Sequence, residues 1–157
     1  MSVKFSGSFV AKGGWWVVAQ LTLFGLILFA LTRNVDPAVP LRVLGWGLIG
    51  MAVLIAGWAM WLIRDKITAM PAPMDGAVLV ERGPFALVRH PIYAGVIIGF
   101  VGLSIKGGNV VALVLSALLI PFFYAKTEHE ERLLTARFPE YASYRTRVGH
   151  RILPWIL

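Results

Sequence analysis

Residues 15–31 read WWVVAQLTLFGLILFAL, an apolar run without a charged side chain. A helix of this composition is almost as long as the ~20 residues that cross a bilayer. Lys4 and Lys12 precede the run, as basic residues precede a signal sequence. The run is longer than the usual apolar core of a signal, about 7–15 residues, and Leu-Thr-Arg-Asn follows it where a small-residue cleavage site would stand. We therefore expect a retained first membrane span.

Three further apolar runs follow, at residues 43–63, 91–105 and 109–125. The first two spans are separated by a short polar turn, and Lys106-Gly107-Gly108-Asn109 joins the last two in a tight helical hairpin. The pattern predicts an all-α integral membrane protein, a single domain over residues 1–157 with about four transmembrane helices. Bare backbone where a neighbouring helix can approach is expected at the glycines of the second span, namely Gly45, Gly47, Gly50 and Gly57.

The composition excludes several classes of protein. Hydrophobic residues make up 58% of the chain and charged residues 15%, whereas soluble domains average about 45–50% and 25%. There is no cysteine, so a disulfide framework and a thiolate metal site are excluded, and three scattered histidines lack the spacing of zinc ligands. The net charge of +7 is not arranged as a basic stripe with interleaved aromatics, so no nucleic-acid partner is expected.

The basic residues are distributed unevenly about the four predicted spans. The N-terminal segment, the loop at residues 64–90 and the C-terminal segment at 126–157 contain two, four and six Lys or Arg, whereas the other side has three. Because cytoplasmic segments carry the excess of Lys and Arg, both termini are expected in the cytoplasm, and a prokaryotic cytoplasmic membrane is the simplest location. The C-terminal segment spaces apolar residues at helical intervals between charges, which predicts an amphipathic helix on this face.

Both hairpin arms are shorter than a perpendicular span requires. Pro121 lies inside the second arm, where it removes a backbone hydrogen bond and leaves the carbonyl of Ala117 to find another partner. A broken helix at membrane depth often borders a cavity. The sequence therefore indicates an opening near the second arm.

Two polar stretches lie at the cytoplasmic ends of the hairpin. The first, Gly83 to Gly95, reads GPFALVRHPIYAG and places Pro91 where a helix begins; the second, Lys126 to Leu134, reads KTEHEERLL and directly follows the broken helix. Either one alone would be an ordinary interfacial helix start or a solvated surface helix. Their predicted juxtaposition at one mouth of the bundle favours a functional site.

These two stretches, with Phe138-Pro139-Glu140-Tyr141 and Tyr144, resemble the isoprenylcysteine carboxyl methyltransferase and phospholipid methyltransferase superfamily. The resemblance covers roughly residues 75–150 and rests on Arg-His-Pro-x-Tyr followed by Glu-Glu-x-x-Leu. It implies a membrane-embedded enzyme that binds S-adenosylmethionine without a Rossmann domain. Consistently, no Gly-x-Gly-x-x-Gly motif follows a predicted strand.

The resemblance also implies roles for individual residues. Cofactor binding is expected from one loop, one helix start and one acidic pair, comprising Ala77, Val78, Leu79, Val80, Phe85, His90, Pro91, Tyr93, Glu130 and Glu131. Catalytic roles are expected for Arg89, Lys126 and Glu130. Of the two glutamates, Glu130 is the expected cofactor ligand and Glu131 the alternative if the alignment shifts by one residue.

Two positions depart from the superfamily pattern. The segment from Phe138 to Tyr141 is one residue shorter than usual, and Lys126 stands where the prenylcysteine enzymes carry an arginine for the substrate carboxylate. Lysine lacks the bidentate fork of arginine, which argues against a prenylcysteine carboxylate as the substrate. The expected acceptor is a lipophilic small molecule with a carboxylate, thiol or amine that enters from the membrane lipid. Two alternatives remain open: a non-enzymatic scaffold or transport subunit, and a related nicotinamide-dependent membrane reductase.

Overall fold

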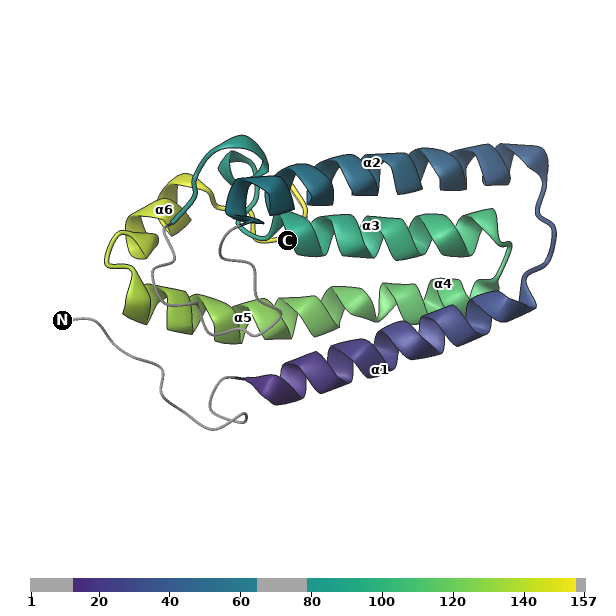
Figure 1. Ribbon diagram of the computed structural model, residues 1–157, viewed down its shortest axis with the longest axis horizontal. Helices are drawn as coiled ribbons and strands as arrows, with labels where there is room; N and C mark the ends of the chain where they lie inside the picture. The colour runs from purple at the N-terminus through teal and green to yellow at the C-terminus, as the bar shows by residue number, and fades with distance from the viewer. Residues whose placement is uncertain (1–12, 65–78, 155–157) are drawn as a thin grey trace.

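The computed structural model describes residues 13–64 and 79–154, which form a bundle of long helices (Figure 1). The helices are α1 (Gly14–Ala30), α2 (Val39–Ile63), α3 (Pro91–Lys106), α4 (Val110–Ala117), α5 (Leu119–Arg137) and α6 (Tyr141–Arg147), with 3₁₀ turns η1 (Leu31–Arg33) and η3 (Gly83–Ala86). No strand occurs in either described range. The predicted all-α class is therefore confirmed.

Three segments of the bundle are long and apolar enough to cross a membrane: Gly14–Arg33, Val39–Ile63 and Val110–Arg137. The helix α3 is apolar but has 16 residues, fewer than the ~20 that a perpendicular span needs. Large apolar side chains point outward along these helices; Leu54 is 74% exposed. Because a soluble protein rarely exposes such a continuous apolar surface, this surface faces lipid and the chain is an integral membrane protein.

Two helix boundaries differ from those expected. The helix α2 begins at Val39 rather than at residue 43, since Pro40 fits in its first turn. The second hairpin arm does not end at residue 125: α4 and α5 follow each other with a single break at Leu118, and α5 continues to Arg137. Pro121 thus bends the arm one turn upstream instead of ending it, and residues 126–137 extend the arm.

The helices α2 and α3 pack with their backbones close together. A Cβ atom added at Gly45 would lie 2.7 Å from the carbonyl oxygen of Gly102, and one added at Gly95 would lie 2.7 Å from Cβ of Ala56. Glycine at these positions allows the close approach, which confirms the prediction for Gly45. The same prediction is wrong for the remaining glycines of α2, because a Cβ at any of them would meet nothing within 4 Å; these are Gly47, Gly50 and Gly57.

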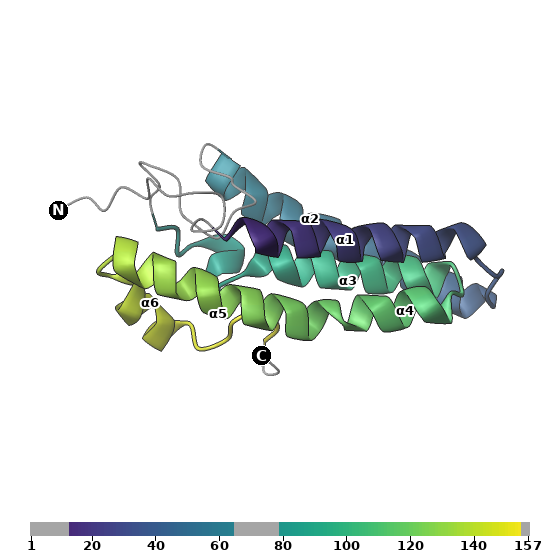
Figure 2. The same cartoon turned by 90° about the horizontal axis from the view of Figure 1, so that it is seen from below.

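The two ends of the bundle differ in construction. At one end, here called the loop end, the connection between α1 and α2 lies against the turn between α3 and α4 (Figure 2). The Val35 amide donates to the Gly107 carbonyl at 3.0 Å, and the Asn109 side chain donates to the carbonyls of Ala30 and Arg33. The other end, here called the site end, contains the start of α3, the second half of α5 and all of α6 (Figure 1).

Candidate functional site

The start of α3 is fixed by the segment that follows α6. The backbone amides of Arg89 and His90 donate to the carbonyls of His150 and Arg151, at 3.1 and 2.8 Å. His90 then caps α3, and its carbonyl accepts from the amide of Ala94 while Pro91 occupies the first helical position. The fixed φ of proline suits this place, so the segment after α6 and the proline together define where α3 begins.

Glu131 is the centre of a buried ionic network. Its carboxylate, 3% exposed, accepts from Nε of Arg89 at 2.7 Å and lies 3.2 Å from Nε2 of His90. Arg145 on α6 and Arg151 beyond it approach the same carboxylate through their Nε atoms, at 3.4 and 3.7 Å. Buried charges are stable only when paired, and this glutamate therefore connects α5, α6 and the start of α3.

Glu130, the neighbouring residue, has a different partner. Its Oε2 accepts from the hydroxyl of Tyr93 at 2.8 Å. The Tyr93 ring is stacked with the rings of His90 and Phe123, with centroids 5.7 and 4.5 Å away and interplanar angles of 12° and 16°. Consecutive residues on a helix point about 100° apart, so the two glutamates serve two separate sets of groups.

Lys126 is buried one turn before Glu130, with 1% of its surface exposed. Its Nζ donates to Oε1 of Gln20 on α1 at 2.6 Å and lies 5.1 Å from the centroid of the Tyr93 ring. A cation over an aromatic face is attracted by the ring quadrupole. The side of Tyr93 that faces α1 is therefore already occupied by a positive charge.

A cluster of aromatic rings lies beside the ionic network. Phe138, Tyr141 and Tyr144 are buried and pack against Leu79. The Tyr144 hydroxyl donates to the carbonyl of Phe85 at 2.6 Å, whereas the buried hydroxyl of Tyr141 has no hydrogen-bond partner in the described part of the chain. Burial raises the pKa of both phenols above its ordinary value, so both are neutral and able to donate.

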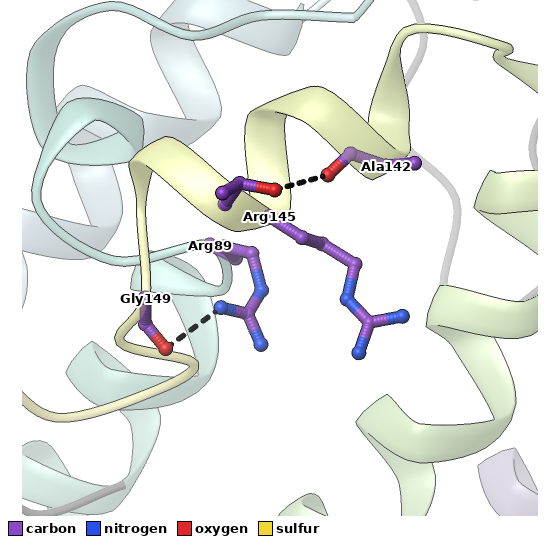
Figure 3. A pocket seen from close by; sticks show the side chains of 5 residues that line it. Arg89, Ala142, Arg145 and Gly149 are labelled. Carbon is purple, nitrogen blue, oxygen red and sulfur yellow. Dashed lines mark hydrogen bonds between the residues drawn. The ribbon is translucent and has the colours of Figure 1, made fainter.

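A hollow of about 380 Å³ opens beside the network (Figure 3). It is lined by Arg89, Ala142, Arg145, Thr146 and Gly149. In Figure 3 the guanidinium groups of Arg89 and Arg145 lie near each other at its edge. The Nη1 of Arg89 is held by the carbonyls of Val148 and Gly149, at 2.7 and 2.9 Å.

The structure brings most of the predicted site residues to the site end. Those in direct mutual contact are Arg89, His90, Tyr93, Lys126, Glu130 and Glu131. Pro91 begins α3, Phe85 contributes its carbonyl, and Leu79 and Val80 are half-buried. The predicted Ala77 and Val78 lie outside the described residues.

The sequence reasoning missed five residues of this site. They are Gln20, Phe123, Tyr141, Arg145 and Arg151. Gln20 carried a usable signal, because an amide inside a membrane span is costly without a partner. The two arginines carried none, since charged residues at the end of a chain are usually solvated.

Comparison with known proteins gives three findings. The model of the phospholipid methyltransferase family matches residues 41–140. The chain is 30% identical over 138 residues to the cobalt-zinc-cadmium resistance protein CzcN of Cupriavidus metallidurans and 29% identical over 139 residues to the nickel-cobalt-cadmium resistance protein NccN of Alcaligenes xylosoxydans xylosoxydans. These alignments cover 86% of the chain in each case, and the chain spans 60% and 61% of the length of these relatives.

Among solved structures, the eukaryotic intramembrane Ras methyltransferase ICMT (isoprenylcysteine carboxyl methyltransferase) is similar to this chain with a TM-score of 0.68. The superposition covers 98% of this chain and 55% of the other, at 20% sequence identity. The similarity establishes the fold. The match to the phospholipid methyltransferase family over residues 41–140 confirms the superfamily resemblance found in the two polar stretches.

Proposed function

Because the chain belongs to the phospholipid methyltransferase family, we propose that it is an S-adenosylmethionine-dependent methyltransferase that acts on a lipophilic acceptor from the bilayer. The observation that carries the proposal is the Glu130–Tyr93 hydrogen bond at 2.8 Å, set in the ring stack of His90, Tyr93 and Phe123. It places a carboxylate and aromatic rings together at the site end of the bundle. These are the groups that a cationic nucleoside requires.

The residues present fit this cofactor. The Tyr141 hydroxyl is buried without a partner among the described residues, and such an atom is costly unless a ligand or water satisfies it. Leu79, one of the predicted cofactor-binding residues, packs on the same tyrosine cluster. We assign cofactor binding to Tyr93, Glu130 and the loop around Leu79.

S-adenosylmethionine, when bound, supplies an electrophilic methyl group. The protein then has to hold the acceptor in line, exclude water and stabilise charge. We propose that Glu130 binds a polar group of the cofactor and that Glu131 acts on the site indirectly. Glu131, Val148 and Gly149 hold Arg89, so we give Arg89 and Glu131 the role of orienting His90 and the start of α3.

Lys126 is the residue that we propose contacts the acceptor. It is buried between α1 and α3, and Gln20 holds it from α1. A carboxylate or thiolate that enters from the lipid would pair with its ammonium and would need no general base. An amine acceptor would first have to lose a proton, and Glu130 is the carboxylate best placed to accept it, since Glu131 is occupied by arginines.

The proposed orientation places the site end in the cytoplasm, where S-adenosylmethionine is made available to enzymes. The asymmetry of twelve basic residues against three supports this direction. A prokaryotic cytoplasmic membrane remains the proposed location. A cysteine introduced at Thr146, on the exposed face of α6, tests the orientation. In sealed right-side-out vesicles a membrane-impermeant maleimide should not label this cysteine, and labelling would contradict the proposed orientation.

The test of the proposed function is calorimetric titration of the purified protein in detergent with S-adenosylmethionine and S-adenosylhomocysteine. Saturable binding is expected, and Glu130→Gln and Tyr93→Phe should each weaken it at least about tenfold, because each removes a charge-assisted hydrogen bond. Glu140→Gln is the matched control: it removes an exposed carboxylate near the start of α6 and should bind as the unaltered protein does. No binding to a folded sample would contradict the proposal.

The relatives favour a second candidate function. Both are named as resistance proteins for divalent metal ions, so the chain could act as a non-enzymatic membrane subunit in metal resistance. Expression in a metal-sensitive host grown with Co²⁺, Zn²⁺ or Cd²⁺ separates the two candidates. Resistance conferred equally by the unaltered chain and by Glu130→Gln would support the non-enzymatic function, whereas resistance lost with Glu130→Gln would connect it to the methyltransferase site.

A further inference from the structure

The positive charge around Glu131 exceeds what the nearby carboxylates neutralise. Three guanidinium groups, those of Arg89, Arg145 and Arg151, lie within 4 Å of this single carboxylate. Arg151 also reaches Glu128 at 3.2 Å, and Glu128 in turn pairs with Arg132. Among the described residues, the ion pairs of this network therefore join four arginines to two glutamates, a surplus of two positive charges.

The surplus is located at the hollow between α6 and the loop before α3. Two of the four arginines, Arg89 and Arg145, line it together with Thr146 (Figure 3). Arg89 is fixed by Glu131 and two carbonyl oxygens, so it contributes charge without a change of position. The volume of about 380 Å³ is ample for a phosphate group and part of what it is attached to.

Arg145 is the arginine best suited to bind a ligand there. Its Nε lies 3.4 Å from the Glu131 carboxylate, and its side chain is 46% exposed. Figure 3 shows its guanidinium group on the same side of α6 as that of Arg89, and both residues line the hollow. A planar guanidinium with two free parallel donors is the preferred partner of phosphate and carboxylate groups.

From these contacts we propose that the hollow lined by Arg89, Arg145 and Thr146 is an anion-binding site for a phosphate group, separate from the proposed cofactor site. The network supplies the charge, Arg145 supplies the donors, and the anion neutralises a surplus that the protein leaves. The site end lies where apolar helices give way to charged α6. The phosphate can therefore come from the headgroup of an anionic lipid or from a free phosphate compound.

The test measures thermal unfolding of the full chain in phosphatidylcholine nanodiscs. One arm adds inorganic phosphate at constant ionic strength set with chloride, and the other replaces part of the lipid with phosphatidylglycerol. A saturable rise of Tm in the phosphate arm identifies a free phosphate ligand, a rise in the lipid arm alone identifies a headgroup, and either result supports the site. If Tm rises in neither arm, the proposed anion site is overturned.

Two controls make the result specific. Arg145→Gln should lower the apparent affinity behind the rise of Tm about tenfold or more, because it removes a charge-assisted contact. Arg147→Gln removes the same charge from the same helix, but Arg147 pairs with Glu81 and does not line the hollow, so the effect should persist. Equal losses in both variants would overturn the proposal, since they would indicate general electrostatic attraction.

A competition experiment separates this site from the cofactor site. Saturating S-adenosylhomocysteine should leave the phosphate effect intact. If it abolishes the effect, the hollow is a part of the cofactor pocket and the separate site is overturned. If the cofactor does not bind at all while the phosphate effect persists and depends on Arg145, the proposed function fails and this site stands.

Discussion

The loop end and the site end of the bundle satisfy their polar groups in different ways. At the loop end, backbone amides and carbonyls pair directly, and one neutral side chain, Asn109, both caps α4 and holds the α1–α2 connection. At the site end, three arginines share Glu131. Among the described residues, the buried side-chain atoms without a hydrogen-bond partner are Nε2 of His129 and the hydroxyl of Tyr141 at the site end, and Nε of Arg42 near the loop end. Incomplete pairing is tolerated at functional sites, and the charged network of the site end fits the ligand-binding role that we propose for it.

The largest effect is expected from Glu131→Gln, which leaves the buried Arg89 without its counter-charge. Removing one partner of a buried ion pair costs about 3–5 kcal/mol, so the free energy of unfolding should fall by that order. Thermal or denaturant unfolding in detergent, followed by circular dichroism, measures it. Glu130→Gln is the comparison, because its carboxylate bonds only the Tyr93 hydroxyl in the described contacts, and it should cost about 1 kcal/mol.

The same contrast can be sharpened with a double replacement. Arg89→Met combined with Glu131→Leu removes both charges, and its cost should be smaller than the sum of the two single costs. If the free energy of unfolding of Glu131→Gln lies within about 0.5 kcal/mol of that of the unaltered protein, the network does not hold the site end together. The division of labour between the two glutamates would then be wrong.

At the loop end, Asn109→Ala should lower the free energy of unfolding by about 2 kcal/mol. It removes a helix cap worth about 1 kcal/mol and two hydrogen bonds to α1 and η1 worth about 0.6 kcal/mol each in a membrane protein. Asn109→Asp keeps the cap acceptor and loses the amide donor, so its loss of stability should be about half that of Asn109→Ala. Binding of S-adenosylmethionine should be unchanged in both, and a large loss of affinity would show that the two ends are coupled.

Most of the fold could be predicted from the sequence because membrane insertion depends on local hydropathy. Residues 15–31 alone indicate a span, and α1 is found there. The helix boundaries could be predicted less well from the sequence. The helix α5 continues to Arg137, because Pro121 bends the arm without ending it and the surrounding helices support the bent arm. Which glycines mediate close packing also depends on the partner helix, so Gly45 could not be separated from Gly47 by sequence pattern.

The candidate site was predicted in outline. The motif residues His90, Tyr93 and Glu130 meet as expected, because short motifs at two helix ends survive as local signals. The sequence could not predict the different partners of Glu130 and Glu131, because they depend on how α5 is rotated about its axis. A shift of one residue would exchange them. Gln20 lies more than a hundred residues from Lys126 in sequence, and no local pattern joins them.

Gln20→Leu addresses the hydrogen bond that joins α1 to α5. Lys126 loses the Gln20 oxygen at 2.6 Å, and hydrogen bonds to charged groups contribute about 1.5–3 kcal/mol; a loss near the lower limit is expected, because Lys126 also contacts the Tyr93 ring. Gln20→Glu is the control, since its carboxylate still accepts. If Gln20→Leu is as stable as the unaltered protein, Gln20 does not hold Lys126.

The smallest effect is expected from Tyr144→Phe, which removes only the hydrogen bond to the Phe85 carbonyl. The cost should be about 1 kcal/mol, and amide exchange should accelerate around η3. Burial raises the pKa of Tyr144, so the phenol donates throughout the neutral range. Above a pH of about 10 the phenol of the unfolded chain ionises while the folded one does not, and the unaltered protein loses stability relative to the variant. Tyr124→Phe is the control, because the Tyr124 side chain is exposed. It should leave both the stability and the amide exchange near η3 unchanged. If the two replacements have equal effects, the hydrogen bond to the Phe85 carbonyl does not order η3.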